Sequence, residues 1–194
     1  MEPRLFYQKT SLSNSRPSIY SYEFFVESYL KANKKIEDYR RLAIVIGNKI
    51  FNTFKSEFGF NNKALLVGPN SDGEFFEDNI NLCLSLNEEL PVWQFSLAFN
   101  IDSDDTFLKT VFGLTITVGE NLESGEYYIS TPKFKSYTKI SSKLVKSIME
   151  KKDYEFNRKD NDMIFEFCKS IFNMIIEHYN SKASSILVKF GYCE

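Results

Sequence analysis

Residues 102–106, Asp-Ser-Asp-Asp-Thr, bring together side chains that could carry out chemistry. Asp102 and Asp104 lie two residues apart and directly follow an alternating apolar run that ends at Ile101. A carboxylate at the end of a strand can attack an electrophile such as phosphorus, and a second carboxylate beside it can act as general acid. Such a pair needs a Mg²⁺ ion to offset its charge.

This D-x-D-x-T pattern, from Asp102 to Thr106, resembles the nucleophile motif of the haloacid-dehalogenase phosphatases. The resemblance covers five residues and the apolar strand before them, and it implies a Mg²⁺-dependent phosphatase with Asp102 as nucleophile. That family sets the motif on the first strand of a parallel sheet, whereas this segment lies mid-chain among segments that predict antiparallel strands. Asp and Ser are also favoured in tight turns. The sequence therefore favours an acidic turn, with the phosphatase as an alternative.

The remaining reactive side chains are few and scattered. His178 is the only histidine, so metal sites that need two histidines are excluded. The three cysteines, Cys83, Cys168 and Cys193, are too few for a disulfide framework and favour a reducing cytoplasm. We expect no cofactor and no metal, and a non-catalytic protein rather than an enzyme.

Charge is strongly segregated along the chain, although the net charge is only −2. Residues 1–69 carry 11 basic and 6 acidic side chains, and residues 127–194 carry 12 and 8. Residues 70–126 carry one lysine and 12 acidic side chains, a net charge of −11. This separation of acidic from basic segments is the strongest non-random feature of the sequence.

Two charged surfaces follow from this layout. The acidic set falls mostly in predicted loops and could dock a basic partner; it comprises Asp72, Glu74, Glu77, Asp78, Glu88, Glu89, Asp102, Asp104, Asp105, Glu120, Glu123 and Glu126. The basic set falls on predicted helices and could contact nucleic-acid phosphates; it comprises Lys31, Lys34, Lys35, Arg40, Arg41, Lys133, Lys135, Lys139, Lys143 and Lys146. Both sets are also explained as ordinary solvated charges on loops and outer helix faces. The pI of about 5.6 argues against binding of nucleic acid.

The N-terminal part predicts a polar arm and then helix. The first 20 residues are rich in serine and predict an extended arm. Ser21 is a candidate N-cap, and apolar residues recur at spacings of three and four over about 22–58. We expect an interruption at 32–35 and a C-terminal glycine at Gly59.

From 63 to 131 the apolar period changes to two, which is typical of strands with one buried face. The predicted strands lie within 63–68, 79–87, 91–101, 110–119 and 125–131. In the third, we expect Trp93, Phe95, Leu97, Phe99 and Ile101 to face the helices, and Gln94, Ser96 and Asn100 to face away. Short connections between these strands leave no room for crossover helices, so the sheet should be antiparallel.

Helical spacing returns at about 134–150 and again at about 161–181, with Asp160 as N-cap of the second helix. That second helix is apolar over a wide arc, which indicates either central burial or a homodimer interface. Residues 184–192 predict a final strand at a sheet edge. No run of apolar residues is long enough to predict a transmembrane helix.

The sequence as a whole predicts an α+β fold in which residues 1–20 form an arm and 21–194 a single domain. An antiparallel meander of four to five strands is covered on one face by an N-terminal helix and two C-terminal helices. The favoured function is a non-catalytic binding module of the inhibitor, immunity or adaptor type, whose acidic loops dock a basic protein. A nucleic-acid-associated protein and a phosphatase at Asp102 and Asp104 remain the alternatives. We expect no membrane contact and a cytoplasmic location, with a homodimer through 161–181 left open.

Overall fold

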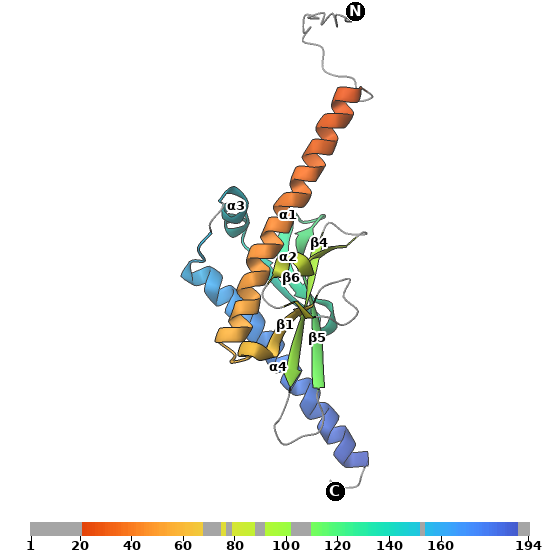
Figure 1. The fold of residues 1–194 in the computed structure, drawn as a ribbon, viewed down its shortest axis with the longest axis vertical. Helices are drawn as coiled ribbons and strands as arrows, with labels where there is room; N and C mark the ends of the chain where they lie inside the picture. The colour runs from red at the N-terminus through yellow and green to blue at the C-terminus, as the bar shows by residue number, and fades with distance from the viewer. Residues whose placement is uncertain are drawn as a thin grey trace, which may run out of the picture. The chain divides into compact units, whose positions relative to one another are not determined.

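The computed structural model describes residues 21–67, 75–76, 79–87, 92–101, 110–151 and 154–189. These residues form the predicted α+β fold, with an antiparallel sheet and helices before and after it (Figure 1). The elements are α1 (Tyr22–Ser56), η1 (Asn61–Lys63), β1 (Ala64–Val67), β2 (Phe75–Phe76), α2 (Ile80–Cys83), β3 (Ser85–Leu86), β4 (Val92–Ile101), β5 (Thr110–Asn121), β6 (Glu126–Thr131), η2 (Pro132–Phe134), β7 (Ser136–Ile140), α3 (Ser142–Glu150) and α4 (Arg158–Lys189).

The chain divides into two compact units, residues 1–35 and 36–194. The described part of the first unit is the beginning of α1. The Ser21 hydroxyl accepts a hydrogen bond from the Phe24 backbone N–H at 3.1 Å, as predicted for an N-cap. The interruption expected at 32–35 is wrong, because alanine and lysine are good helix formers and α1 continues through them.

The second unit contains the sheet. The described strands pair antiparallel in the order β2-β1-β4-β5-β6-β7, and β3 also pairs with β4. Strands β4, β5 and β6 are neighbours both in sequence and in space and form the predicted meander, and β7, which lies in a segment predicted as helix, adds a further neighbouring strand. The long β4–β5 ladder runs from Val92 opposite Gly119 to Ile101 opposite Thr110, and it fixes which loops share an end of the sheet.

The face of β4 that points toward the helices is the one predicted from the alternation of apolar and polar residues in the sequence. Phe95, Leu97 and Phe99 are each at most 1% exposed. Trp93 packs against the core, and its indole N–H donates to the Ile36 carbonyl at 3.3 Å. The polar side chains on the outer face are only partly buried: Gln94, Ser96 and Asn100.

Helices cover this inner face through aromatic contacts. The Phe54 ring of α1 lies 4.9 Å from the Phe99 ring, and the Tyr179 ring of α4 lies 6.1 Å from the Phe112 ring, measured between centroids. Within α4 the centre of the apolar arc is buried in the chain's own core, in agreement with central burial, one of the two predicted alternatives; the buried residues are Ile164, Phe167, Cys168, Ile171 and Ile175. A homodimer through this helix stays a prediction.

The strand predicted at 79–87 is wrong over most of its length. Residues 80–83 form the short helix α2, and only Ser85 and Leu86 are a strand. The Asn79 side chain accepts a hydrogen bond from the Asn81 N–H at 3.2 Å, and this local cap competes with strand pairing. As a result Leu82 is 58% exposed rather than buried.

The helix predicted at 134–150 begins later than expected. Residues 136–140 form strand β7, and α3 starts only after Ser141, whose hydroxyl accepts from the Leu144 N–H at 3.2 Å. The apolar spacing of three and four in this segment arose from a strand followed by a helix. Lys135 has a left-handed φ of +51° and turns the chain between β6 and β7.

Helix α4 is longer at both ends than predicted. Asn157, not Asp160, caps it: the Asn157 Oδ1 atom accepts the Asp160 N–H at 3.1 Å, so the predicted cap at Asp160 is wrong. At the other end the helix continues to Lys189, which contradicts a strand at 184–189. Each added residue of a formed helix gains one backbone hydrogen bond. Residues 190–192 of the predicted strand lie outside the described residues.

Candidate functional site

Only a small part of the predicted acidic surface falls within the described residues. Glu120, Glu123 and Glu126 belong to the β5–β6 hairpin. The other predicted acidic residues lie outside the described ranges: Asp72, Glu74, Glu77, Asp78, Glu88, Glu89, Asp102, Asp104 and Asp105. The phosphatase alternative at Asp102 and Asp104 therefore stays a prediction.

The β4–β5 register nevertheless relates two acidic segments through their flanking residues. Asn87 donates its backbone N–H to the Val92 carbonyl at 3.0 Å, and Val92 pairs with Gly119. The chain therefore enters and leaves 88–91, the segment that contains Glu88 and Glu89, beside the β5–β6 hairpin. We call this end of the sheet the acidic end. Ile101 and Thr110, which flank 102–109, pair at the opposite end.

A groove of about 450 Å³ opens at the acidic end. Its walls combine carboxylates with aromatic and aliphatic side chains, so it offers both charge and apolar surface. Leu122 is 64% exposed and Tyr137 is 54% exposed, so neither is part of the core. The lining residues are Val92, Glu120, Asn121, Leu122, Glu123, Tyr128 and Tyr137.

The hairpin turn that forms one wall is held by its own side chains. The Asn121 Oδ1 atom accepts the backbone N–H groups of Glu123 and Ser124, at 2.9 and 3.2 Å. Gly125 has a φ of +66° and donates its N–H to the Asn121 carbonyl at 2.7 Å. A glycine suits this left-handed position, because other residues pay a steric cost there. The turn thus holds the backbone of Glu123 at the groove.

The three described glutamates of the acidic end differ in their partners. Glu120 accepts a hydrogen bond from the Tyr39 hydroxyl. The pKa of Tyr39 is raised mainly by burial and to a smaller extent by this hydrogen bond. Glu126 pairs with Lys139, and this hydrogen bond raises the pKa of the lysine. Among the described residues, the Glu123 side chain has no ion-pair or hydrogen-bond partner. Its charge is available to a ligand.

Two tyrosines form the other wall of the groove. The Tyr128 and Tyr137 rings are stacked, with centroids 5.3 Å apart and planes at 26°. Tyr128 lies directly opposite Gly119 in the β5–β6 ladder, so no side chain of β5 competes for the space beside its ring. Burial, and then the neighbouring Tyr137, raise the pKa of Tyr128, so this ring stays neutral at physiological pH.

The sequence did not predict this tyrosine pair, because Tyr137 falls within the segment 134–150 that was predicted to be a helix. The signal was present: two runs rich in aromatic and β-branched residues, 126–131 and 136–140, flank a four-residue connection that begins with Pro132. That pattern is typical of a hairpin. Reading it as one would have placed Tyr128 and Tyr137 on adjacent strands.

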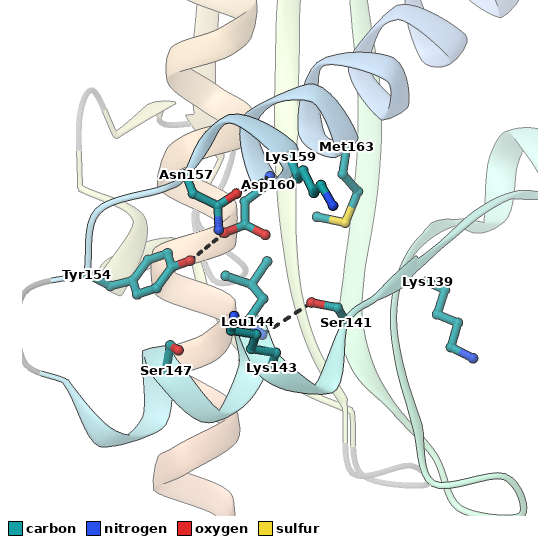
Figure 2. A pocket seen from close by; sticks show the side chains of 10 residues that line it. All are labelled: Lys139, Ser141, Lys143, Leu144, Ser147, Tyr154, Asn157, Lys159, Asp160 and Met163. Atoms are coloured by element: carbon teal, nitrogen blue, oxygen red, sulfur yellow. Dashed lines mark hydrogen bonds between the residues drawn. The ribbon is translucent and has the colours of Figure 1, made fainter.

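A second cavity, of about 370 Å³, lies between β7, α3 and the start of α4 (Figure 2). Three lysines line it, Lys139, Lys143 and Lys159, together with the buried carboxylate of Asp160. Figure 2 shows the Tyr154 hydroxyl donating to Asp160, at 2.5 Å. This bond ties the connector before α4 to its first turn, which is a structural role.

Members of the predicted basic set make contacts within the chain: Arg41 donates to the Met149 carbonyl at 2.9 Å, and Lys133 donates to the Gly113 carbonyl at 3.2 Å. Arg40 lies near Glu37, and Lys146 near Glu150. Lys139 and Lys143 of this set both line the cavity between β7, α3 and the start of α4.

Two of the cysteines and the histidine lie within the described residues. Cys83 and Cys168 are buried free thiols, and burial raises the pKa of both. The His178 ring packs edge-on to Tyr179, with centroids 5.8 Å apart. In the part of the chain that the structure describes, no three His, Cys, Asp or Glu side chains are grouped to hold a metal ion. Within the same ranges, no helix combines the length and apolarity needed to cross a bilayer.

Comparisons with known proteins identify no relative: no family model, no curated protein and no solved structure matches this chain. Function is therefore inferred from the groove and the charges around it.

Proposed function

We propose that this protein is a non-catalytic binding module, of the inhibitor, immunity or adaptor type, that docks a basic segment of a partner protein at its acidic end. The groove beside Glu123 carries this proposal, because it joins an uncompensated carboxylate to exposed apolar surface. Val92, which lines the groove, directly follows residues 88–91 in the sequence, and that segment includes Glu88 and Glu89. The reducing cytoplasm expected for the free thiols fits such a role.

Electrostatics supports a basic partner. A net charge of −11 within residues 70–126 produces a negative potential that attracts cationic segments and speeds their encounter. Charges separated by more than the Debye length, about 10 Å at 0.1 M salt, are largely screened. Binding at the acidic end should therefore weaken as salt rises. The nucleic-acid alternative has less support, since Arg41 and Lys133 are engaged within the chain.

Two triple variants with equal charge change can test the proposal. Glu88→Gln, Glu89→Gln and Glu123→Gln together remove two charges from the segment flanked by Asn87 and Val92 and one from the β5–β6 hairpin. Asp102→Asn, Asp104→Asn and Asp105→Asn remove three from the segment flanked by Ile101 and Thr110. The probe is a fluorescent peptide of nine lysines. Its affinity is measured by fluorescence anisotropy between about 0.05 and 0.5 M NaCl, a range that spans the 0.1 M salt at which the Debye length is about 10 Å.

We expect the first triple variant to raise the dissociation constant about tenfold and to flatten its salt dependence, since rim charges contribute about 0.5 kcal/mol each. The second should change affinity less than about threefold, which matches the loss of long-range attraction alone. If the wild type does not bind the peptide, or if the second variant has the larger effect, docking at the acidic end is wrong. Host proteins captured by the wild type and lost by the first variant would identify the partner.

A further inference from the structure

The groove at the acidic end has a chemistry more specific than negative charge. One wall is the stacked pair of Tyr128 and Tyr137, and the other is the turn that carries Leu122 and Glu123. Tyr137 is 54% exposed although its ring is packed on Tyr128, so the pair still presents aromatic surface to a ligand. An aromatic face and an unpaired carboxylate in one groove are complementary to a cation with apolar faces.

Arginine matches this pair of walls better than lysine. Its guanidinium is planar, stacks on aromatic rings and is more weakly hydrated than an ammonium group, and it can donate two parallel hydrogen bonds to one carboxylate. Lysine offers only a compact, strongly hydrated point charge. The exposed Leu122 can also cover the three methylene groups of an arginine side chain.

We propose that this groove binds an arginine side chain of the basic partner, with the guanidinium stacked on Tyr137 and paired with Glu123. This inference rests on the proposed function, and it names the residue by which the partner is recognised. Arginine is enriched among the residues that dominate binding energy at interfaces, especially where neighbouring apolar groups exclude water.

A lysine beside Tyr128 does not oppose this arrangement. Lys139 lies directly opposite Tyr128 in the β6–β7 ladder, on the same face of the sheet. Its ammonium group is paired with Glu126, so its charge is compensated within the chain. Glu120 is likewise engaged by Tyr39, which leaves Glu123 as the described glutamate of the hairpin that is available to the guanidinium.

The groove floor is built so that these walls can approach. A Cβ atom at Gly119 would lie 2.2 Å from the Val92 Cγ1 atom, so β5 must carry glycine where Val92 packs. The same glycine lies opposite Tyr128, so the Val92 side chain rather than a side chain of β5 lies next to that position. Val92 is only 2% exposed and contributes apolar lining to the groove.

The test compares two fluorescent peptides of equal length and charge, nine arginines and nine lysines, on the full chain. A stack on an exposed aromatic ring strengthens binding about threefold to fivefold, so the wild type should prefer the arginine peptide by about that factor. Tyr137→Ala and Glu123→Gln should each abolish the preference, whereas Tyr137→Phe should retain it because the ring remains. Tyr22→Ala, which removes an aromatic side chain that is 77% exposed and outside the groove, is the matched control and should leave both affinities unchanged.

The outcomes separate the two proposals. Equal affinity of the wild type for both peptides, or a preference that survives Tyr137→Ala, overturns the arginine site and leaves docking at the acidic end in place. Failure of both peptides to bind overturns the docking proposal itself. Because Tyr137 is mostly exposed, Tyr137→Ala should fold, and the Tyr137→Phe variant decides the question if it does not.

Discussion

Two glycines on the same strand provide a sharp test of the packing at the acidic end. Gly113 and Gly119 lie six residues apart on β5, so both face outward from the helices. A Cβ atom added at Gly113 would meet nothing within 4 Å. One added at Gly119 would lie 2.2 Å from Cγ1 and 2.8 Å from Cβ of Val92. The same substitution should therefore have opposite effects at the two positions.

The magnitude follows from which atoms can move. A χ1 rotation of Val92 can shift Cγ1, but Cβ is fixed to the backbone. Moving Cβ from 2.8 Å to the 3.4 Å at which ordinary contact begins requires a displacement of about 0.6 Å between β4 and β5. Overpacking of this kind costs about 1 to 3 kcal/mol. Replacing glycine by alanine within a strand otherwise gains about 0.5 to 1 kcal/mol.

We expect Gly113→Ala to raise the free energy of unfolding by about 0.5 to 1 kcal/mol. Gly119→Ala carries the same gain, so the difference between the variants isolates the clash with Val92, at about 1 to 3 kcal/mol. Urea denaturation with a common m-value measures both. Equal stability of the two variants would refute the close approach of β4 and β5 at Val92, and with it the groove floor.

Two further predictions test the core and the α4 connector. Phe167→Ala should cost about 3 to 5 kcal/mol, because Phe167 is 2% exposed, whereas Phe165→Ala, two residues away and 37% exposed, should cost less than about 1.5 kcal/mol; similar losses would contradict the burial of α4. Burial, and then the bond to Asp160, raise the pKa of Tyr154 from 10.0 to about 12, so its neutral form is favoured in the folded state. Its contribution to stability should be complete below pH 10 and lost as pH rises through 12, and pH-dependent unfolding of Tyr154→Phe should lack this part of the decline. Parallel curves for wild type and variant would count against the bond.

The apolar period along the chain was enough to predict the central strands and their faces. Phe95, Leu97 and Phe99 alternate with polar residues, and burying one face of a strand requires that alternation whatever partner covers it. The N-cap at Ser21 could also be predicted from the sequence, because an N-cap side chain accepts hydrogen bonds from backbone N–H groups in the first turn of its own helix. Such features depend on residues within a few positions of one another.

Where the local sequence pattern is compatible with both a helix and a strand, tertiary packing or a local hydrogen bond determines which of the two forms. The apolar spacing around Tyr137 and Ile140 fits a helix, yet pairing with β6 makes 136–140 a strand. At Asn79 a side-chain cap outweighed the alternation that followed it. A weak local preference yields when tertiary contacts or a local hydrogen bond favour the alternative.

The candidate site shows the same division. The positions of the charged residues along the sequence were enough to locate the acidic region, since counting charges does not require the fold. The sequence could not show that Glu126 is neutralised by Lys139, or that the Tyr39 hydroxyl bonds Glu120 from 81 residues away. Nor could it show that Tyr128 and Tyr137 stack beside Glu123. These relations depend on strand register and helix packing, because only the tertiary fold brings residues so distant in sequence within contact distance.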